Sequence, residues 1–198
     1  DLYDTRSNSG DSYKWLALRD SLAEISFLIN RNSPSVSHIK GNTFLRSPKP
    51  NYDSAFFYFR KAIDLESGYA PYIYTMSAFY DYVGLLEEAE VYSEKALAAD
   101  PLNIRYYAHC IAYKFYNSKF DDARVLIRKG LELEDHLGIS FVSLLMSYME
   151  NDQAAFERSL RIFRQQFPTS SHLRSLTGLL SAAQGNKEEA INLTRGTE

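Results

Sequence analysis

The feature that most constrains the fold of this chain is a repeat with a period of about 34 residues. Three alanines mark it at one constant spacing: Ala55, Ala89 and Ala123. A second series of turn-forming residues keeps the same spacing apart from one shorter interval: Gly84, Ser118, Asn151 and Gly185. Two independent series with one period predict an array of similar units, each packed on the next.

Each half of the repeat has the pattern of an amphipathic helix, because apolar residues recur at i, i+3, i+4 and i+7. Small residues stand where two helix axes must approach closely: Ala89, Ala96, Ala123, Gly130 and Ala190. Pro101 and Pro168 follow the second helix of their repeats, where a proline ends the helix. We therefore predict an all-α fold of paired antiparallel helices with no sheet.

The same pattern predicts where the helices lie. The expected helices span residues 52–65, 70–83, 86–99, 104–116, 119–133, 138–150, 152–167, 171–184 and 187–194. A further helix is expected over Asp11–Asn30, with an apolar face formed by Trp15, Leu16, Leu18, Leu22, Ile25 and Leu28.

The stretch between 31 and 50 interrupts the pattern, because residues 32–50 contain three prolines, four serines and a glycine. We expect an irregular connection here. Residues 1–50 would then supply one helix that completes a split first repeat, and residues 51–198 would form the repeat array. The helix over 11–30 would bury the Phe56–Phe59 region of the helix over 52–65.

Two interpretations of this connection remain open. In the first, it is a surface loop held down by Ile39, Phe44 and Leu45. In the second, it forms an additional binding lip, since long loops in compact domains are often functional. The residues of that lip would be Lys40, Phe44, Arg46 and Lys49.

Composition excludes several classes of protein. The chain has 22 basic and 25 acidic residues and a net charge of −3, so no nucleic-acid surface is expected. An apolar run long enough to span a membrane is absent. Cys110 is the single cysteine, which rules out an internal disulfide. The chain begins at Asp1, so we expect a fragment or a processed form; the cytoplasm is the expected compartment, and the periplasm remains open for a fragment of a larger protein.

No catalytic or metal-binding pattern is present, so we expect neither an enzyme nor a cofactor. The histidines lie in different segments: His38, His109, His136 and His172. His109 and Cys110 are adjacent, and adjacent side chains on a helix point about 100° apart, which suits no single metal ion. Acidic pairs such as Glu87-Glu88 precede the second helices, where they favour the positive end of the helix dipole.

The repeat resembles the tetratricopeptide repeat family. The resemblance is best over Ala70–Asn103 and covers roughly residues 51–193. The residues that carry it are Tyr80, Gly84, Ala89, Tyr92, Ala96 and Pro101. It implies a right-handed α-solenoid of stacked antiparallel helix pairs, and a function in binding other proteins.

In this family the first helix of each pair lines a concave groove that holds a partner. The resemblance places the core of such a groove at Tyr74, Asp81, Tyr82, Arg105, His109, Tyr116, Phe141 and Tyr148, with Phe115, Met149, His172 and Ser175 beside them. Such an aromatic surface suits an amphipathic peptide or helix, although each aromatic residue could instead pack between neighbouring helices. The basic clamp with which co-chaperones hold acidic C-terminal tails is missing, since the corresponding positions hold Tyr74, Ala78, Ala108 and Ala112.

The sequence thus predicts a protein–protein interaction scaffold or adaptor that binds a peptide or helix, with its oligomeric state open. The alternative is a regulatory or sensor domain of a larger bacterial transcription activator. A DNA-binding domain elsewhere in the full-length gene would favour the alternative.

Overall fold

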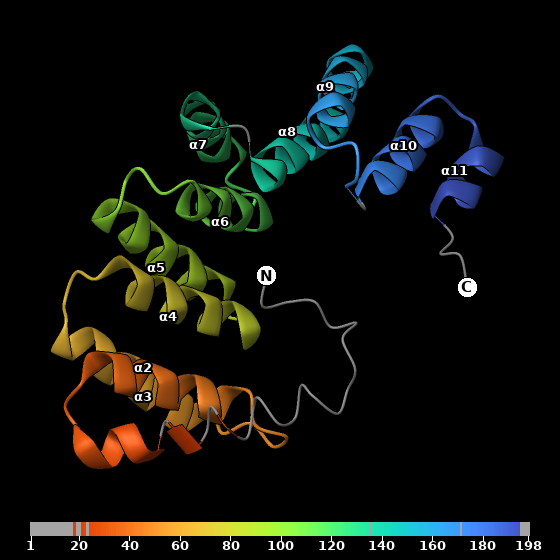
Figure 1. Ribbon diagram of the computed structural model, residues 1–198. Helices are drawn as coiled ribbons and strands as arrows, with labels where there is room; N and C mark the ends of the chain where they lie inside the picture. Colours follow the sequence, from red (N-terminus) through yellow and green to blue (C-terminus); the bar gives the residue numbers. More distant parts are fainter. Residues whose placement is uncertain (1–17, 19–20, 23, 135, 171, 195–198) are drawn as a thin grey trace. The chain divides into compact units, whose positions relative to one another are not determined.

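The computed structural model describes residues 18, 21–22, 24–134, 136–170 and 172–194 (Figure 1). The named helices are α2 (Pro34–Leu45), α3 (Tyr52–Leu65), α4 (Ala70–Tyr82), α5 (Leu86–Ala99), α6 (Ile104–Tyr116), α7 (Phe120–Leu133), α8 (Leu137–Met149), α9 (Gln153–Gln166), α10 (His172–Ala183) and α11 (Lys187–Thr194). The described residues contain no strand. None of the described helices is long and apolar enough to cross a membrane.

The chain divides into two compact units, Asp1–Ala99 and Asp100–Glu198. Consecutive helices pack as pairs within each unit: α2 with α3 and α4 with α5 in the first, then α6 with α7, α8 with α9 and α10 with α11 in the second. From α3 onward, every helix begins and ends within one residue of its predicted boundary. The prediction of an all-α helical-repeat fold is confirmed.

The turn between the two helices of a pair explains one of the sequence series. Gly84, Ser118, Asn151 and Gly185 all have positive φ, between 56° and 82°. In the turn after α4, the amide of Leu85 donates to the carbonyl of Tyr80 at 2.8 Å, and the turns after α6, α8 and α10 contain the same hydrogen bond. This left-handed cap reverses the chain and favours a small or flexible residue, which is why the turn positions recur.

The alanine series marks the crossings between paired helices. Ala55, Ala89 and Ala123 are fully buried, as predicted. In α9 the same position holds Phe156, which is also buried and packs with Leu144, Leu160, Phe163 and Leu176. The fourth repeat therefore fills its crossing with an aromatic ring instead of bringing two backbones close together.

The predicted irregular connection over 31–50 is wrong, because residues 34–45 form α2. Pro34 stands in the first turn of that helix, where its missing N–H costs nothing, and the Ser33 side chain caps the helix by accepting from the amide of Val36. Pro48 and Pro50 lie in the turn that follows. The prolines thus flank the helix instead of breaking it.

The partner of α3 is also different from the prediction. α2 packs along α3, so the first repeat is continuous, and a division at residue 50 would separate two paired helices. Of the predicted helix over 11–30, the described residues 18, 21–22 and 24–29 are helical, and Leu18, Leu22, Ile25 and Leu28 are exposed. Trp15 and Leu16 lie outside the described residues. Phe27 makes the contact to α3 instead, with its ring edge-on to Tyr58 at 6.1 Å.

Candidate protein-interaction surface

The eight predicted groove residues all lie on the first helices of their pairs, but they differ in how much of each side chain is available. Tyr82 and Tyr116 are each 60% exposed. Asp81 and Arg105 are exposed as well, whereas the other four are half-buried: Tyr74, His109, Phe141 and Tyr148. Four of the eight side chains are therefore open to a partner without rearrangement.

Tyr82 and Tyr116 occupy equivalent places one repeat apart, in the last turn of α4 and of α6. Met149 stands at the corresponding end of α8 and is 57% exposed. Tyr82 has a neighbour from the preceding helix, since its ring lies 6.1 Å from that of the partly exposed Tyr52. Each of these three repeats thus presents a large side chain at the same point.

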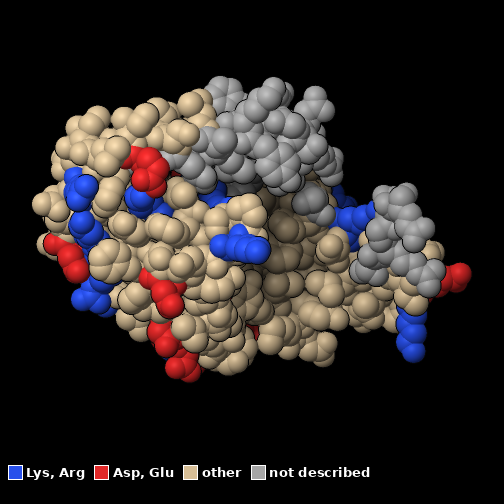
Figure 2. All heavy atoms as spheres, turned by 90° about the horizontal axis from the view of Figure 1, so that it is seen from below, with Lys and Arg blue, Asp and Glu red and all other residues tan. Residues whose placement is uncertain are grey.

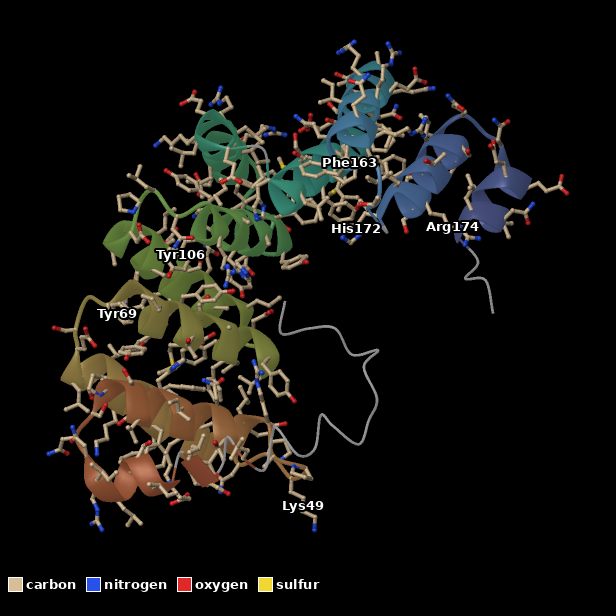
Figure 3. The ribbon with its side chains drawn as sticks, in the orientation of Figure 1. Lys49, Tyr69, Tyr106, Phe163, His172 and Arg174 are labelled. Carbon is tan, nitrogen blue, oxygen red and sulfur yellow. The ribbon has the colours of Figure 1, made fainter. Side chains whose placement is uncertain are left out.

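The half-buried aromatic residues pack within the chain. The Phe141 ring lies 4.5 Å from the ring of His172, which joins the first helices α8 and α10. Figure 3 shows His172 at the start of α10, close to α8. Tyr148 packs on Phe156 of α9, with 5.8 Å between ring centroids, and therefore belongs partly to the core.

Sequence reasoning missed a polar row on α2, because it did not predict that helix. His38 Nε2 and Thr75 Oγ1 are 3.0 Å apart, and the Asn42 amide lies 3.1 Å from the same histidine nitrogen. One turn earlier, the hydroxyls of Ser35 and Tyr72 are 2.9 Å apart. Burial lowers the pKa of His38, and the nearby charge of Arg46 lowers it further. The Ser33-Pro34 pair, a typical helix start, was the signal that could have revealed this helix.

The start of α8 has a histidine cap. His136 Nδ1 accepts from the amide of Gly138 at 3.2 Å. Burial lowers the pKa of His136; Glu134 opposes this effect and Arg105 reinforces it. The start of α8 lies against α6, since a methyl group placed on Gly138 would lie 3.8 Å from the Ala108 methyl.

The residues of the predicted binding lip do not share one exposed surface. Lys40 is buried: its ammonium lies 4.7 Å from the centre of the Phe27 ring and 5.9 Å from each of Phe44 and Tyr58, and it pairs with Glu24. This cation–π cluster fastens residues 24–27 to α2 and α3. The interpretation of Lys40 as a binding residue is therefore wrong, whereas Arg46 and Lys49 are exposed in the following turn.

Charged side chains of both signs are mixed on the face of the molecule seen in Figure 2. The blue and red side chains lie close together at the left of this view, so neither sign forms a patch of its own there. Nowhere among the described residues do three His, Cys, Asp or Glu side chains gather as a metal site would require. Cys110 is buried.

No protein-family model matches the sequence, and no curated protein matches it either. Several solved structures do match. The structure of pilF from Pseudomonas aeruginosa aligns over 93% of this chain and 85% of its own, with a TM-score of 0.72 and 16% identity. A crystal structure of MamA aligns over 81% of this chain and 87% of its own, with a TM-score of 0.66 and 14% identity.

The third structure is that of YrrB, described as a tetratricopeptide repeat protein with an unusual peptide-binding site. It aligns over 86% of this chain and 88% of its own, with a TM-score of 0.64 and 17% identity. All three neighbours are tetratricopeptide repeat proteins. The resemblance seen in the repeats is therefore confirmed at the level of the fold, and this chain has the fold of the tetratricopeptide repeat proteins.

Proposed function

We propose that this protein is an interaction scaffold or adaptor that binds a peptide or helix of another protein along its first helices. The observation that carries the proposal is the exposure of Tyr82 and Tyr116, 60% each, at equivalent positions of successive repeats. A large aromatic side chain with a polar tip is the residue type that anchors protein partners most often. The peptide-binding site named for YrrB supports the same use of this fold.

The test is a selection of peptides from an unbiased display library on the full chain, followed by affinity measurements with the selected peptides. The variant Tyr82→Ala with Tyr116→Ala should weaken binding at least about tenfold, because truncating a buried anchor costs about 2 kcal/mol or more. Circular dichroism should show unchanged helicity.

The matched control lies on the second helices. Val91 in α5 and Val125 in α7 are also one repeat apart, and they are 47% and 41% exposed. Val91→Ala with Val125→Ala should leave affinity unchanged. If the valine variant loses the peptide and the tyrosine variant keeps it, the partner binds the second helices and the proposed surface is wrong.

A further inference from the structure

Acidic residues are distributed unevenly between the two kinds of helix. The chain has 25 Asp and Glu residues, but the five first helices α2, α4, α6, α8 and α10 contain a single one, Asp81. The second helices α3, α5, α7, α9 and α11 contain twelve. Helix dipoles do not explain this difference, because the first turn of a first helix would favour carboxylates as much as that of a second helix.

In the second unit, all the acidic residues within these helices lie on the second helix of a pair. The helices α6, α8 and α10 contain no Asp or Glu, whereas they contain Arg105, Lys114 and Arg174. These three helices touch in succession: a methyl group placed on Gly138 of α8 would lie 3.8 Å from the Ala108 methyl of α6, and the Phe141 ring of α8 lies 4.5 Å from the tilted His172 ring of α10. The helices α6, α8 and α10 therefore form one continuous packed series.

Two of the three basic side chains are already engaged within the chain. Lys114 is buried with its ammonium 3.8 Å from a carboxylate oxygen of Asp122. Arg174 donates to the carbonyl oxygens of Leu193 and Asn192 at the end of α11, toward which Figure 3 shows it directed. Arg105 is the remaining basic residue of these helices and is exposed, as are His172 and Tyr116.

We infer that the partner segment bound by α6, α8 and α10 is acidic, with Asp or Glu side chains that accept hydrogen bonds from Arg105, His172 and Tyr116. This inference rests on the proposed function and specifies its partner. The first helices of this unit present donors and contribute no carboxylate, so an acidic segment meets a complementary charge at Arg105, whereas a basic segment meets none on these helices. Because the co-chaperone clamp is missing, carboxylates of side chains are bound here, not a chain terminus.

A nucleic acid is also anionic but fits this surface poorly. Phosphate recognition needs clusters of Lys and Arg that release counterions from several phosphates. Here one exposed guanidinium stands among aromatic and neutral side chains, which suits a peptide with a few carboxylates and apolar residues between them.

The experiment uses the full chain and a library of short random peptides in which both ends of each peptide are fused to the display protein. Selected peptides should contain more Asp and Glu than Lys and Arg. A synthetic, C-terminally amidated copy should bind, and replacing its acidic residues by Asn and Gln should weaken binding at least about tenfold in fluorescence anisotropy. Raising the salt concentration should weaken it as well.

Arg105→Glu should reduce affinity for the selected peptide at least about tenfold. The control is Arg161→Glu, which changes an exposed arginine on the second helix α9 and should have no comparable effect. Selected peptides that are basic or uncharged, or an Arg105→Glu variant with unchanged affinity, would overturn the inference while leaving the proposed function intact. Displacement of the peptide by a single-stranded oligonucleotide would overturn it too. A selection that enriches no peptide would contradict the proposed function itself.

Discussion

The ring of Phe59 in α3 lies directly against the backbone of Gly41 in α2. A methyl group on Gly41 would come within 2.5 Å of two ring carbons. Phe59 is 1% exposed and packs with Ala55, Met76 and Phe79, so its ring has little room to move. Glycine at this position is therefore what allows the first helix pair to close.

Gly41→Ala should consequently destabilise the protein. Overpacking a filled core costs about 1–3 kcal/mol, and the gain in helix propensity from Gly to Ala, about 1 kcal/mol, offsets only part of it. Chemical denaturation should detect the loss. Gly138→Ala is the control, because its nearest contact would be an ordinary 3.4 Å and no stability should be lost.

Ala89→Leu should overpack the crossing between α4 and α5. Ala89 is fully buried, and its carbonyl accepts a hydrogen bond from the Ser77 hydroxyl at 2.7 Å, so the two helices are held close together. The expected cost is about 1–3 kcal/mol, measured as a lower midpoint of thermal unfolding. Val91→Leu, on an exposed side of the same helix, should change the midpoint little.

Substitutions at two of the turn positions should change the stability of the protein in opposite directions. Ser118 has a φ of 60° and Gly84 a φ of 82°. Ser118→Gly should stabilise the protein by up to about 1 kcal/mol, because glycine adopts this conformation without steric cost. Gly84→Ala should destabilise it by about the same amount, although its added methyl group would meet no neighbour within 4 Å. Equal stability of both variants would contradict a strain-based explanation of the turn series.

Replacing the buried Lys40 should loosen the attachment of residues 24–29 to α2 and α3. Lys40→Ala loses the Glu24 ion pair and the contacts with three aromatic rings. Amide hydrogen exchange in residues 24–29 should become faster, while the amides of α4 and α5 should keep their protection. Lys95→Ala removes a cation–π contact with Tyr92 on α5 and should leave residues 24–29 unchanged.

Stability should fall as the pH decreases from about 7 to about 5. Burial lowers the pKa of His38 and of His136 below the ordinary value of 6.5, so the unfolded chain binds protons at a higher pH than the folded chain does. Their contribution is therefore present above 6.5 and is lost as the pH falls below it. Protonation would also prevent His136 Nδ1 from accepting the Gly138 amide.

The measurement is the free energy of unfolding at several pH values. His38→Gln with His136→Asn should flatten the slope between pH 7 and pH 5, since Asn can still cap the helix. Replacing the exposed His172 by Gln serves as the control. An unchanged slope in the double variant would assign the pH dependence to other groups.

The sequence by itself determined the repeat, the helix type and nearly all helix boundaries from α3 onward. These features depend on local rules: an apolar period, a small residue at each crossing, and a left-handed cap at each turn. Ala89 and Gly84 follow such rules. A close crossing of two helices requires a small residue, and a left-handed cap favours glycine, whichever repeat it belongs to.

Only the tertiary structure decided the beginning of the array and the availability of its surface. The turn between α2 and α3 spans residues 46–51, compared with residues 83–85 between α4 and α5, so the first helix pair departs from the regular spacing. The composition of residues 32–50 argued against a helix, yet the contact between Gly41 and Phe59 and the capping of α2 by Ser33 favour one.

The same holds for the aromatic residues of the candidate surface. Tyr82 and Tyr148 read alike in sequence, but packing of Tyr148 on Phe156 leaves it half-buried whereas Tyr82 is exposed. How deeply a side chain is buried depends on the residues of the helix that packs against it. The sequence pattern of one helix does not show which residues those are.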